Sequence, residues 1–169
     1  MNAIAAIETR YRHVVTRSRL EARWLVWLDS LQVPWEYEPE DFSLPDRGYR
    51  PDLWLPKQEA WCEIKPSGVP FDHQLAAAIQ EQSGSPLLWI AGEPRAGCYS
   101  ISLADFGGVE EVPGLVFAMN RKGELWLADP EQTCCLPLPP RWMEFDDDFP
   151  LMEARDLEAA YRRAMTWRF

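Results

Sequence analysis

The sequence predicts a single α/β domain in which helices cover a mixed β-sheet, and three features of the chain indicate this fold class. Residues 17–31 place apolar side chains at helical spacing, and short extended segments separated by Pro, Asp and Gly follow. An alanine-rich helical stretch then precedes a short apolar strand of the kind that is buried on both faces. The order is α-β-β-β-α-β, with further strands and a terminal helix after it. No long linker or internal repeat divides the 169 residues, so we expect one domain over residues 1–169.

The first helix is expected over residues 17–31. Its apolar positions are Leu20, Trp24, Trp27, Leu28 and Leu31. Ser18 followed by Glu21 is typical of a capping box at a helix start, and Pro34 closes the stretch. The spacing of Trp24 and Trp27 places both in the hydrophobic core.

The remaining elements follow from alternation and from turn residues. Strands are expected at residues 35–37, 42–44, 49–55 and 60–65, which we interpret as one meander. A second helix is expected over residues 71–82, ended by Ser83 and Gly84, and the strand of residues 86–91 follows it. Further strands are expected at residues 98–103, 115–119 and 124–127, and a last helix at residues 151–167.

The composition limits the class of protein. A formal net charge of -10 argues against a general nucleic-acid coating protein, because such binding depends on Lys and Arg neutralising phosphates. Two segments are nevertheless basic: residues 10–23 hold five arginines and one glutamate, and Arg162, Arg163 and Arg168 lie near the end of the chain. The sequence therefore allows a basic surface on an acidic protein.

The cysteines and the hydropathy suggest the compartment. The four cysteines, Cys62, Cys98, Cys134 and Cys135, contain no C-x-x-C pair, so neither a zinc ribbon nor a disulfide framework is indicated. No apolar stretch approaches the roughly 20 residues that cross a bilayer, and the first residues lack the order of a secretory signal. We expect a cytoplasmic protein.

The chemically informative stretch is Y-R-P-D-L-W-L-P-K-Q-E-A-W-C-E-I-K, residues 49–65. If two strands meet at a turn centred between Lys57 and Gln58, Asp52 lies opposite Glu63 and Trp54 opposite Trp61. Lys65 then shares a face with Glu63, while Cys62 and Ile64 point the other way, into the core. The hairpin therefore predicts two carboxylates and one ammonium group at one place.

Such a group of side chains suits a divalent cation. Two carboxylates that lie close together repel, so they are partly protonated or are neutralised by a cation. Oxygen ligands favour Mg²⁺ or Mn²⁺ over zinc, and a bound ion of this kind supports phosphodiester hydrolysis. The plainer alternative is that Asp52 and Glu63 are solvated hairpin residues and that Lys65 forms a cross-strand ion pair.

This arrangement resembles the PD-(D/E)XK nuclease superfamily, in which the Pro-Asp precedes a turn and the E-x-K lies on the next strand. The segments R-S-R-L-E-A-R-W, W-E-Y-E-P-E, Y-R-P-D-L-W-L-P and W-C-E-I-K-P are similar to a lineage of small members from phages and mobile elements. The S-x-x-E, Y-x-P-D and E-x-K pattern is also similar to TnsA-type transposon endonucleases. The likeness covers residues 17–91, which would form a restriction-endonuclease-like core, whereas residues 92–169 match only loosely.

The resemblance implies roles for further residues. It implies that Glu21 on the first helix and the backbone carbonyl of Ile64 join Asp52 and Glu63 around the metal, with Lys65 assisting the attack of water. An exposed Glu21 paired with an arginine is an equally weighted alternative. Arg17 and Arg19 are candidates to hold a phosphate, and Gln74 is a candidate contact to the nucleic acid near the cut; plain surface roles remain open for all three.

The expected function is therefore a Mg²⁺- or Mn²⁺-dependent endonuclease that hydrolyses DNA, from a phage or mobile element. A homodimer is the natural expectation if both strands of a duplex are cut. One alternative keeps the nuclease fold without catalysis, as a module that binds a protein partner or regulates a nucleic-acid complex. Another is a ribonuclease or a resolvase of branched DNA.

Overall fold

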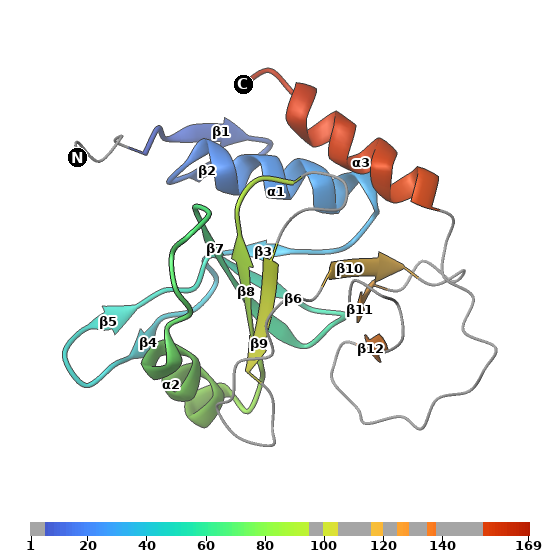
Figure 1. Ribbon diagram of the computed structural model, residues 1–169. Coiled ribbons are helices and arrows are strands. Elements are labelled where there is room, and N and C mark those ends of the chain that lie inside the picture. The colour runs from blue at the N-terminus through green and yellow to red at the C-terminus, as the bar shows by residue number, and fades with distance from the viewer. Residues whose placement is uncertain (1–5, 95–99, 105–115, 120–124, 129–134, 138–153) are drawn as a thin grey trace.

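The computed structural model describes residues 6–94, 100–104, 116–119, 125–128, 135–137 and 154–169. The protein has a mixed α/β fold built on a central sheet of five strands in the order β3-β6-β7-β8-β9 (Figure 1). Their bounds are Glu36–Tyr37 for β3, Leu53–Leu55 for β6, Ala60–Lys65 for β7, Leu87–Ala91 for β8 and Ser100–Ala104 for β9. Strands β7 and β8 are parallel and the other neighbours are antiparallel, so the sheet is mixed, as the sequence predicts.

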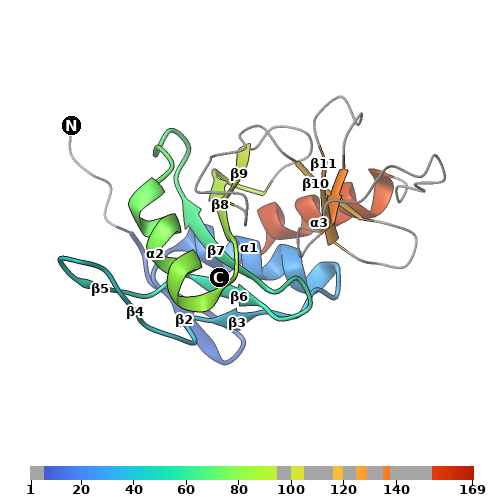
Figure 2. The same ribbon diagram turned by 90° about the horizontal axis from the view of Figure 1, so that it is seen from below.

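Helices cover both faces of this sheet. Helix α1, Arg19–Ser30, packs against α3, Ala154–Thr166, on one face, and α2, His73–Ser83, lies on the other. Figure 2 shows α2 in front of the strands, with α1 and α3 behind them. Helix α2 forms the connection from β7 to β8. These two strands are parallel, and adjacent parallel strands need a long crossover between the end of one and the start of the next.

Two apolar clusters hold the layers together, one on each face of the sheet. The larger cluster joins Trp24 and Trp27 of α1 to Leu53, Cys62 and Ile64, which point to the same side of β6 and β7. The smaller joins Leu75 and Ile79 of α2 to Trp61 and Trp89. This confirms that Trp24 and Trp27 belong to the core and that Cys62 and Ile64 face away from Glu63. Cys62 is a free, buried thiol, and Cys98 and Cys134 lie outside the described residues.

Three smaller sheets surround this core. Strands β1, Thr9–Tyr11, and β2, Val14–Thr16, form a hairpin that the sequence did not indicate. Strand β4, Phe42–Ser43, pairs with β5, Gly48–Tyr49, and a third sheet contains β10, Val116–Met119, β11, Leu125–Ala128, and β12, Cys135–Pro137. Of these, β12 was also not expected.

The expected single meander over residues 35–65 is wrong. Strands β4 and β5 form their own hairpin, closed by a hydrogen bond from the Leu44 N–H to the Arg47 carbonyl at 2.7 Å. The strand expected over residues 49–55 is interrupted before β6, where Pro51 offers no N–H group to a neighbouring strand. The main chain therefore leaves the central sheet after β3 and returns only at Leu53.

The ends of the helices follow local signals. Ser18 is the N-cap of α1, and its Oγ accepts a hydrogen bond from the N–H of Glu21 at 3.2 Å. Helix α2 begins after Asp72 and ends at Gly84, whose left-handed backbone, with φ of 70°, suits glycine. In the described part of the chain, no helix is long and apolar enough to cross a membrane.

Candidate active site

The β6–β7 hairpin has the register that the sequence predicts. Leu53 pairs with Cys62, Trp54 with Trp61 and Leu55 with Ala60. The rings of Trp54 and Trp61 are in contact, with 4.7 Å between their centroids. Asp52 directly precedes β6, and its side chain reaches the last residues of β7, where Oδ2 accepts a hydrogen bond from the N–H of Ile64 at 2.7 Å.

Glu63 is the innermost charged residue of the site, with 0 % of its surface exposed. Its Oε1 accepts a hydrogen bond from the hydroxyl of Tyr49 at 2.5 Å and forms an ion pair with Nζ of Lys65. Its Oε2 is buried and has no hydrogen-bond partner among the described residues. A buried carboxylate oxygen without a partner is costly, so this atom is suited to accept a bond from a ligand.

Glu21 reaches the same region from the first turn of α1. Its Oε1 accepts a hydrogen bond from the Ser18 hydroxyl at 2.7 Å. Its Oε2 accepts one from the Tyr37 hydroxyl at 2.7 Å and one from the Arg17 N–H at 3.0 Å. Both oxygens of Glu21 therefore help to fix the start of the helix, and the alternative in which Glu21 is an exposed carboxylate is wrong, because Glu21 is buried.

Arg17 covers Asp52 on the solvent side. Its Nη2 donates to Oδ1 of Asp52 at 2.7 Å, and its Nε lies 2.6 Å from Oε1 of Glu38, an ion pair without hydrogen-bond geometry. The Arg17 side chain is 53 % exposed, whereas Asp52 is 2 % exposed. Arg17, a candidate to hold a phosphate, is thus engaged with two carboxylates, and the sequence did not predict this pairing.

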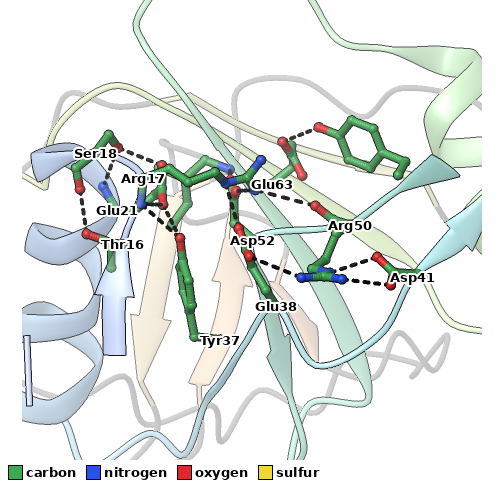
Figure 3. Close-up of polar contacts among 12 residues, drawn as sticks. Thr16, Arg17, Ser18, Glu21, Tyr37, Glu38, Asp41, Arg50, Asp52 and Glu63 are labelled. Atoms are coloured by element: carbon green, nitrogen blue, oxygen red, sulfur yellow. Dashed lines mark hydrogen bonds and ion pairs between the residues drawn. The ribbon is translucent and has the colours of Figure 1, made fainter. Parts of the chain in front are cut away.

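A chain of alternating charges leads from this arginine to the surface (Figure 3). Glu38 also lies 3.8 Å from Nη1 of Arg50. Arg50 in turn holds Asp41 through two hydrogen bonds of 2.7 Å, from Nε and from Nη2. A series of ion pairs therefore links the buried carboxylate to the exposed β4–β5 hairpin. It runs through Asp52, Arg17, Glu38, Arg50 and Asp41.

Burial and neighbouring negative charges raise the pKa of Asp52 well above its ordinary value. Desolvation is the main cause, and the carboxylates of Glu63 and Glu21 add to it, while the N–H of Ile64 and the ammonium group of Lys65 oppose it. Burial also raises the pKa of the Tyr49 hydroxyl, with the charge of Glu63 and the hydrogen bond to it as further causes. The site therefore concentrates negative charge in a place from which water is excluded.

The donor set fits a hard divalent cation, although this arrangement does not form a complete metal site. The oxygens of Asp52 and Glu63 are the ligand type that Mg²⁺ and Mn²⁺ prefer, and Oε2 of Glu63 is free to accept a bond. Within the described ranges, however, no three His, Cys, Asp or Glu side chains form a group that could hold a metal ion. An ion bound at Oδ1 of Asp52 would lie beside the positive charge of Arg17, because Arg17 donates to that oxygen.

The structure brings together most of the residues that the sequence singled out. Glu21, Arg17 and Asp52 lie in one network of hydrogen bonds and ion pairs, and Glu63 and Lys65 form a second one with Tyr49, whose charges act on Asp52. Arg19 and Gln74 are exposed and make no contact with either network. The backbone of Ile64 takes part through its N–H group, which binds Asp52.

Three further residues of the site were not identified from the sequence: Tyr49, Tyr37 and Glu38. The two tyrosines donate to Glu63 and Glu21, and Glu38 pairs with Arg17. Tyr37 and Glu38 belong to the W-E-Y-E-P-E segment, whose polar and aromatic alternation was a usable signal. Tyr49 belongs to the Y-x-P-D pattern, but that pattern did not place its hydroxyl beside Glu63, because Tyr49 lies on a hairpin outside the central sheet.

No protein-family model matches the chain, and no curated protein matches its sequence.

Proposed function

We propose that this chain is a nuclease that hydrolyses DNA phosphodiester bonds with Mg²⁺ or Mn²⁺, of the PD-(D/E)XK type. The observation that carries the proposal is the pair of buried carboxylates of Asp52, directly before β6, and Glu63, on the neighbouring strand β7, with the ammonium group of Lys65 paired to Glu63. Ordinary hairpin residues would be solvated, and a buried acidic pair is costly unless cations, hydrogen bonds or a ligand compensate it, so such pairs are frequent at functional sites.

Each residue of the group has a role in such a reaction. Asp52, Oε2 of Glu63 and the carbonyl of Ile64 would hold the ion, and Glu21 adds negative charge at the start of α1. The ion, when bound, lowers the pKa of a water molecule and offsets the charge of the phosphate. Lys65, 28 % exposed, extends from the buried Glu63 toward solvent, where its Nζ can orient the attacking water or neutralise charge on the phosphate.

Lys65 provides the direct test of this function. Lys65→Met should reduce DNA cleavage by at least about 100-fold while the chain keeps its fold and its affinity for DNA, because general acid-base and electrostatic groups contribute on this scale. Lys57→Met is the matched control: Lys57 is exposed in the turn of the same hairpin, at the end away from Glu63. Wild-type protein that cuts neither DNA nor RNA with Mg²⁺ or Mn²⁺ would overturn the proposal.

The second candidate function is a nuclease-fold module without catalysis that binds a protein partner. One observation favours it: Arg17 already neutralises Asp52, so an ion is not needed to balance that carboxylate. The two candidates differ in their response to Mn²⁺. An enzyme should gain thermal stability with Mn²⁺ in a manner that requires Glu63, whereas a silent module should show no such gain.

The substrate and the assembly are tested with the same protein. Linear duplex, single-stranded, branched and RNA substrates separate a deoxyribonuclease from a branched-DNA resolvase and from a ribonuclease. Sedimentation with and without duplex DNA tests the proposed homodimer, which two-strand cleavage requires if one site cuts one strand. The proposed setting in a phage or mobile element rests on the sequence resemblance alone.

A further inference from the structure

The two basic segments of the sequence meet on one surface of the fold. The β1–β2 hairpin and the C-terminal end of α3 lie side by side along α1 (Figure 1), and the ring of Tyr11 contacts that of Trp167 edge to face at 5.7 Å. The guanidinium of Arg163 lies over the Trp167 ring, 5.6 Å from its centroid. We call residues 7–16 and 158–169 together the terminal surface.

The terminal surface has the opposite charge to the rest of the chain. It contains five arginines and two glutamates, a net charge of +3 in a protein whose formal net charge is -10. Arg12 is paired with Asp29 and Arg162 with Glu158. Arg10 and Arg168 are exposed and form no ion pair with any described residue, so both remain available to an anionic partner.

The same surface exposes apolar and aromatic side chains. Five large hydrophobic residues are exposed in the described part of the chain, and four of them belong to the terminal surface: Ile7, Val15, Trp167 and Phe169. Exposed apolar side chains that gather on one part of a folded domain are typical of surfaces that bind a partner. Aromatic rings beside unpaired arginines are the combination that binds unstacked bases and their phosphates.

The terminal surface is continuous with the candidate active site. Arg10 pairs with Val15 across the hairpin, and Val15 is two residues before Arg17, the residue that covers Asp52. Thr16 fixes this junction, because its hydroxyl donates to the carbonyl of Ser18 at 2.8 Å. Two residues of extended chain span about 7 Å, which is about two phosphate spacings of a stacked strand.

We infer that the terminal surface binds a single strand of nucleic acid that flanks the site of cleavage. Arg10 and Arg168 contact its phosphates, and a base stacks on Trp167. This inference rests on the proposed function for the identity of the polymer, but its residues are separate from Asp52, Glu63 and Lys65.

A second copy of this chain is the other occupant to consider, and charge disfavours it. A two-fold symmetric contact would bring each terminal surface against its own copy, so that a net charge of +3 would face a net charge of +3. A polyanion removes this repulsion and also neutralises the unpaired arginines.

The test measures binding without cleavage. A fluorescein-labelled single-stranded oligonucleotide is titrated with the full chain in EDTA at several salt concentrations, and anisotropy gives the affinity. Arg10→Gln and Arg168→Gln should each weaken binding and each reduce the slope of log affinity against log salt by about 0.7, the value for one phosphate contact on a single strand. Lys57→Gln, an exposed cation on the far hairpin turn, should leave the slope unchanged.

Trp167→Leu separates stacking from charge. It should weaken binding by about 5- to 150-fold, the range for loss of one stacked base, without changing the salt slope. Unfolding temperatures of all variants show whether the fold is kept. The inference is wrong if both arginine variants keep the wild-type slope, if a duplex of equal length binds as tightly as the single strand, or if the variants alter only sedimentation of the chain.

These outcomes are distinct from failure of the proposed function. A chain that binds through Arg10 and Arg168 but cuts nothing disproves the nuclease and leaves the terminal surface as a binding site. A chain that cuts DNA, with all terminal-surface variants cutting and binding like the wild type, disproves this inference alone.

Discussion

The guanidinium of Arg17 lies against the carboxylate of Asp52, with Nη2 2.7 Å from Oδ1. This contact joins residues 35 positions apart and places a fixed positive charge where an approaching cation would first meet the site. In the proposed metal site, a divalent ion and Arg17 would therefore compete for the same oxygen.

Replacement of Arg17 should strengthen metal binding. Arg17→Gln removes a positive charge from contact with Asp52, and two unit charges about 5 Å apart near a protein surface interact by about 3 kcal/mol. We expect the affinity for Mn²⁺, measured by calorimetry, to rise by at least about 10-fold. Arg50→Gln is the matched control, because Arg50 belongs to the same charge network but contacts Glu38 and Asp41. Equal affinities in Arg17→Gln and wild type would show that the ion does not bind at Asp52.

Glu63→Gln should stabilise the metal-free protein and abolish metal binding. The amide oxygen of Gln can still accept from Tyr49 and Lys65, while the negative charge that opposes Asp52 is removed. We expect a gain of about 1 kcal/mol, which raises the unfolding temperature by about 2–4 °C in a chain of this size. Mn²⁺ should stabilise the wild type but not this variant. Glu59→Gln, at an exposed position of the same hairpin, should match the wild type in both measurements. A lower unfolding temperature for Glu63→Gln would contradict the view that Glu63 is held there for a ligand.

The sequence predicted those parts of the site that depend on contacts between nearby residues. The alternation of the β6–β7 hairpin placed Trp54 opposite Trp61, and Asp52 beside the strand that carries Glu63 and Lys65. Ser18 and Gly84 likewise marked the ends of the helices. A capping residue bonds to backbone groups only a few positions away, so its effect can be predicted from the local sequence.

Contacts between distant segments could not be predicted in this way. The pairing of Arg17, a candidate to hold a phosphate, with Asp52 was not predicted, because the hairpin that carries Asp52 lies next to the start of α1 only in the folded chain. Tyr49 reaches Glu63 from a separate hairpin, whose departure from the central sheet was missed. The contact between β1 and the end of α3 likewise depends on the packing of both elements against α1. Hydrophobic periodicity and secondary-structure propensity do not predict such packing.

Tyr11 should make stability depend on alkaline pH. Its hydroxyl donates to Oδ2 of Asp29 at 2.6 Å, and burial, this hydrogen bond and the charge of Asp29 raise its pKa from 10.0 to about 12. The folded chain then keeps a proton that the unfolded chain loses above pH 10, so stability falls as the pH rises from about 10 to about 12. Tyr11→Phe should remove about 1 kcal/mol of stability at pH 8, and this deficit should vanish near pH 12. Urea unfolding of both proteins at pH 8, 10 and 11 measures the difference. A deficit that stays constant over this range would mean that Tyr11 contributes only by packing.

Tyr49 and Tyr37 should differ in their effect on the metal, although each donates a hydrogen bond to a buried glutamate. Tyr49 binds Oε1 of Glu63 and so directs the partnerless Oε2 toward the site; loss of such a supporting hydrogen bond weakens metal binding by about 10- to 100-fold. We expect this loss for Tyr49→Phe, with the fold kept because the ring still packs beside Trp61. Tyr37 binds Glu21, whose two oxygens already serve Ser18 and Arg17, so Tyr37→Phe should lower stability by about 1 kcal/mol and leave the affinity for Mn²⁺ unchanged. Calorimetry with Mn²⁺ separates the two variants. If Tyr37→Phe weakens Mn²⁺ binding as strongly as Tyr49→Phe does, Glu21 is a metal ligand, and its hydrogen bonds at the start of α1 must open when the ion binds.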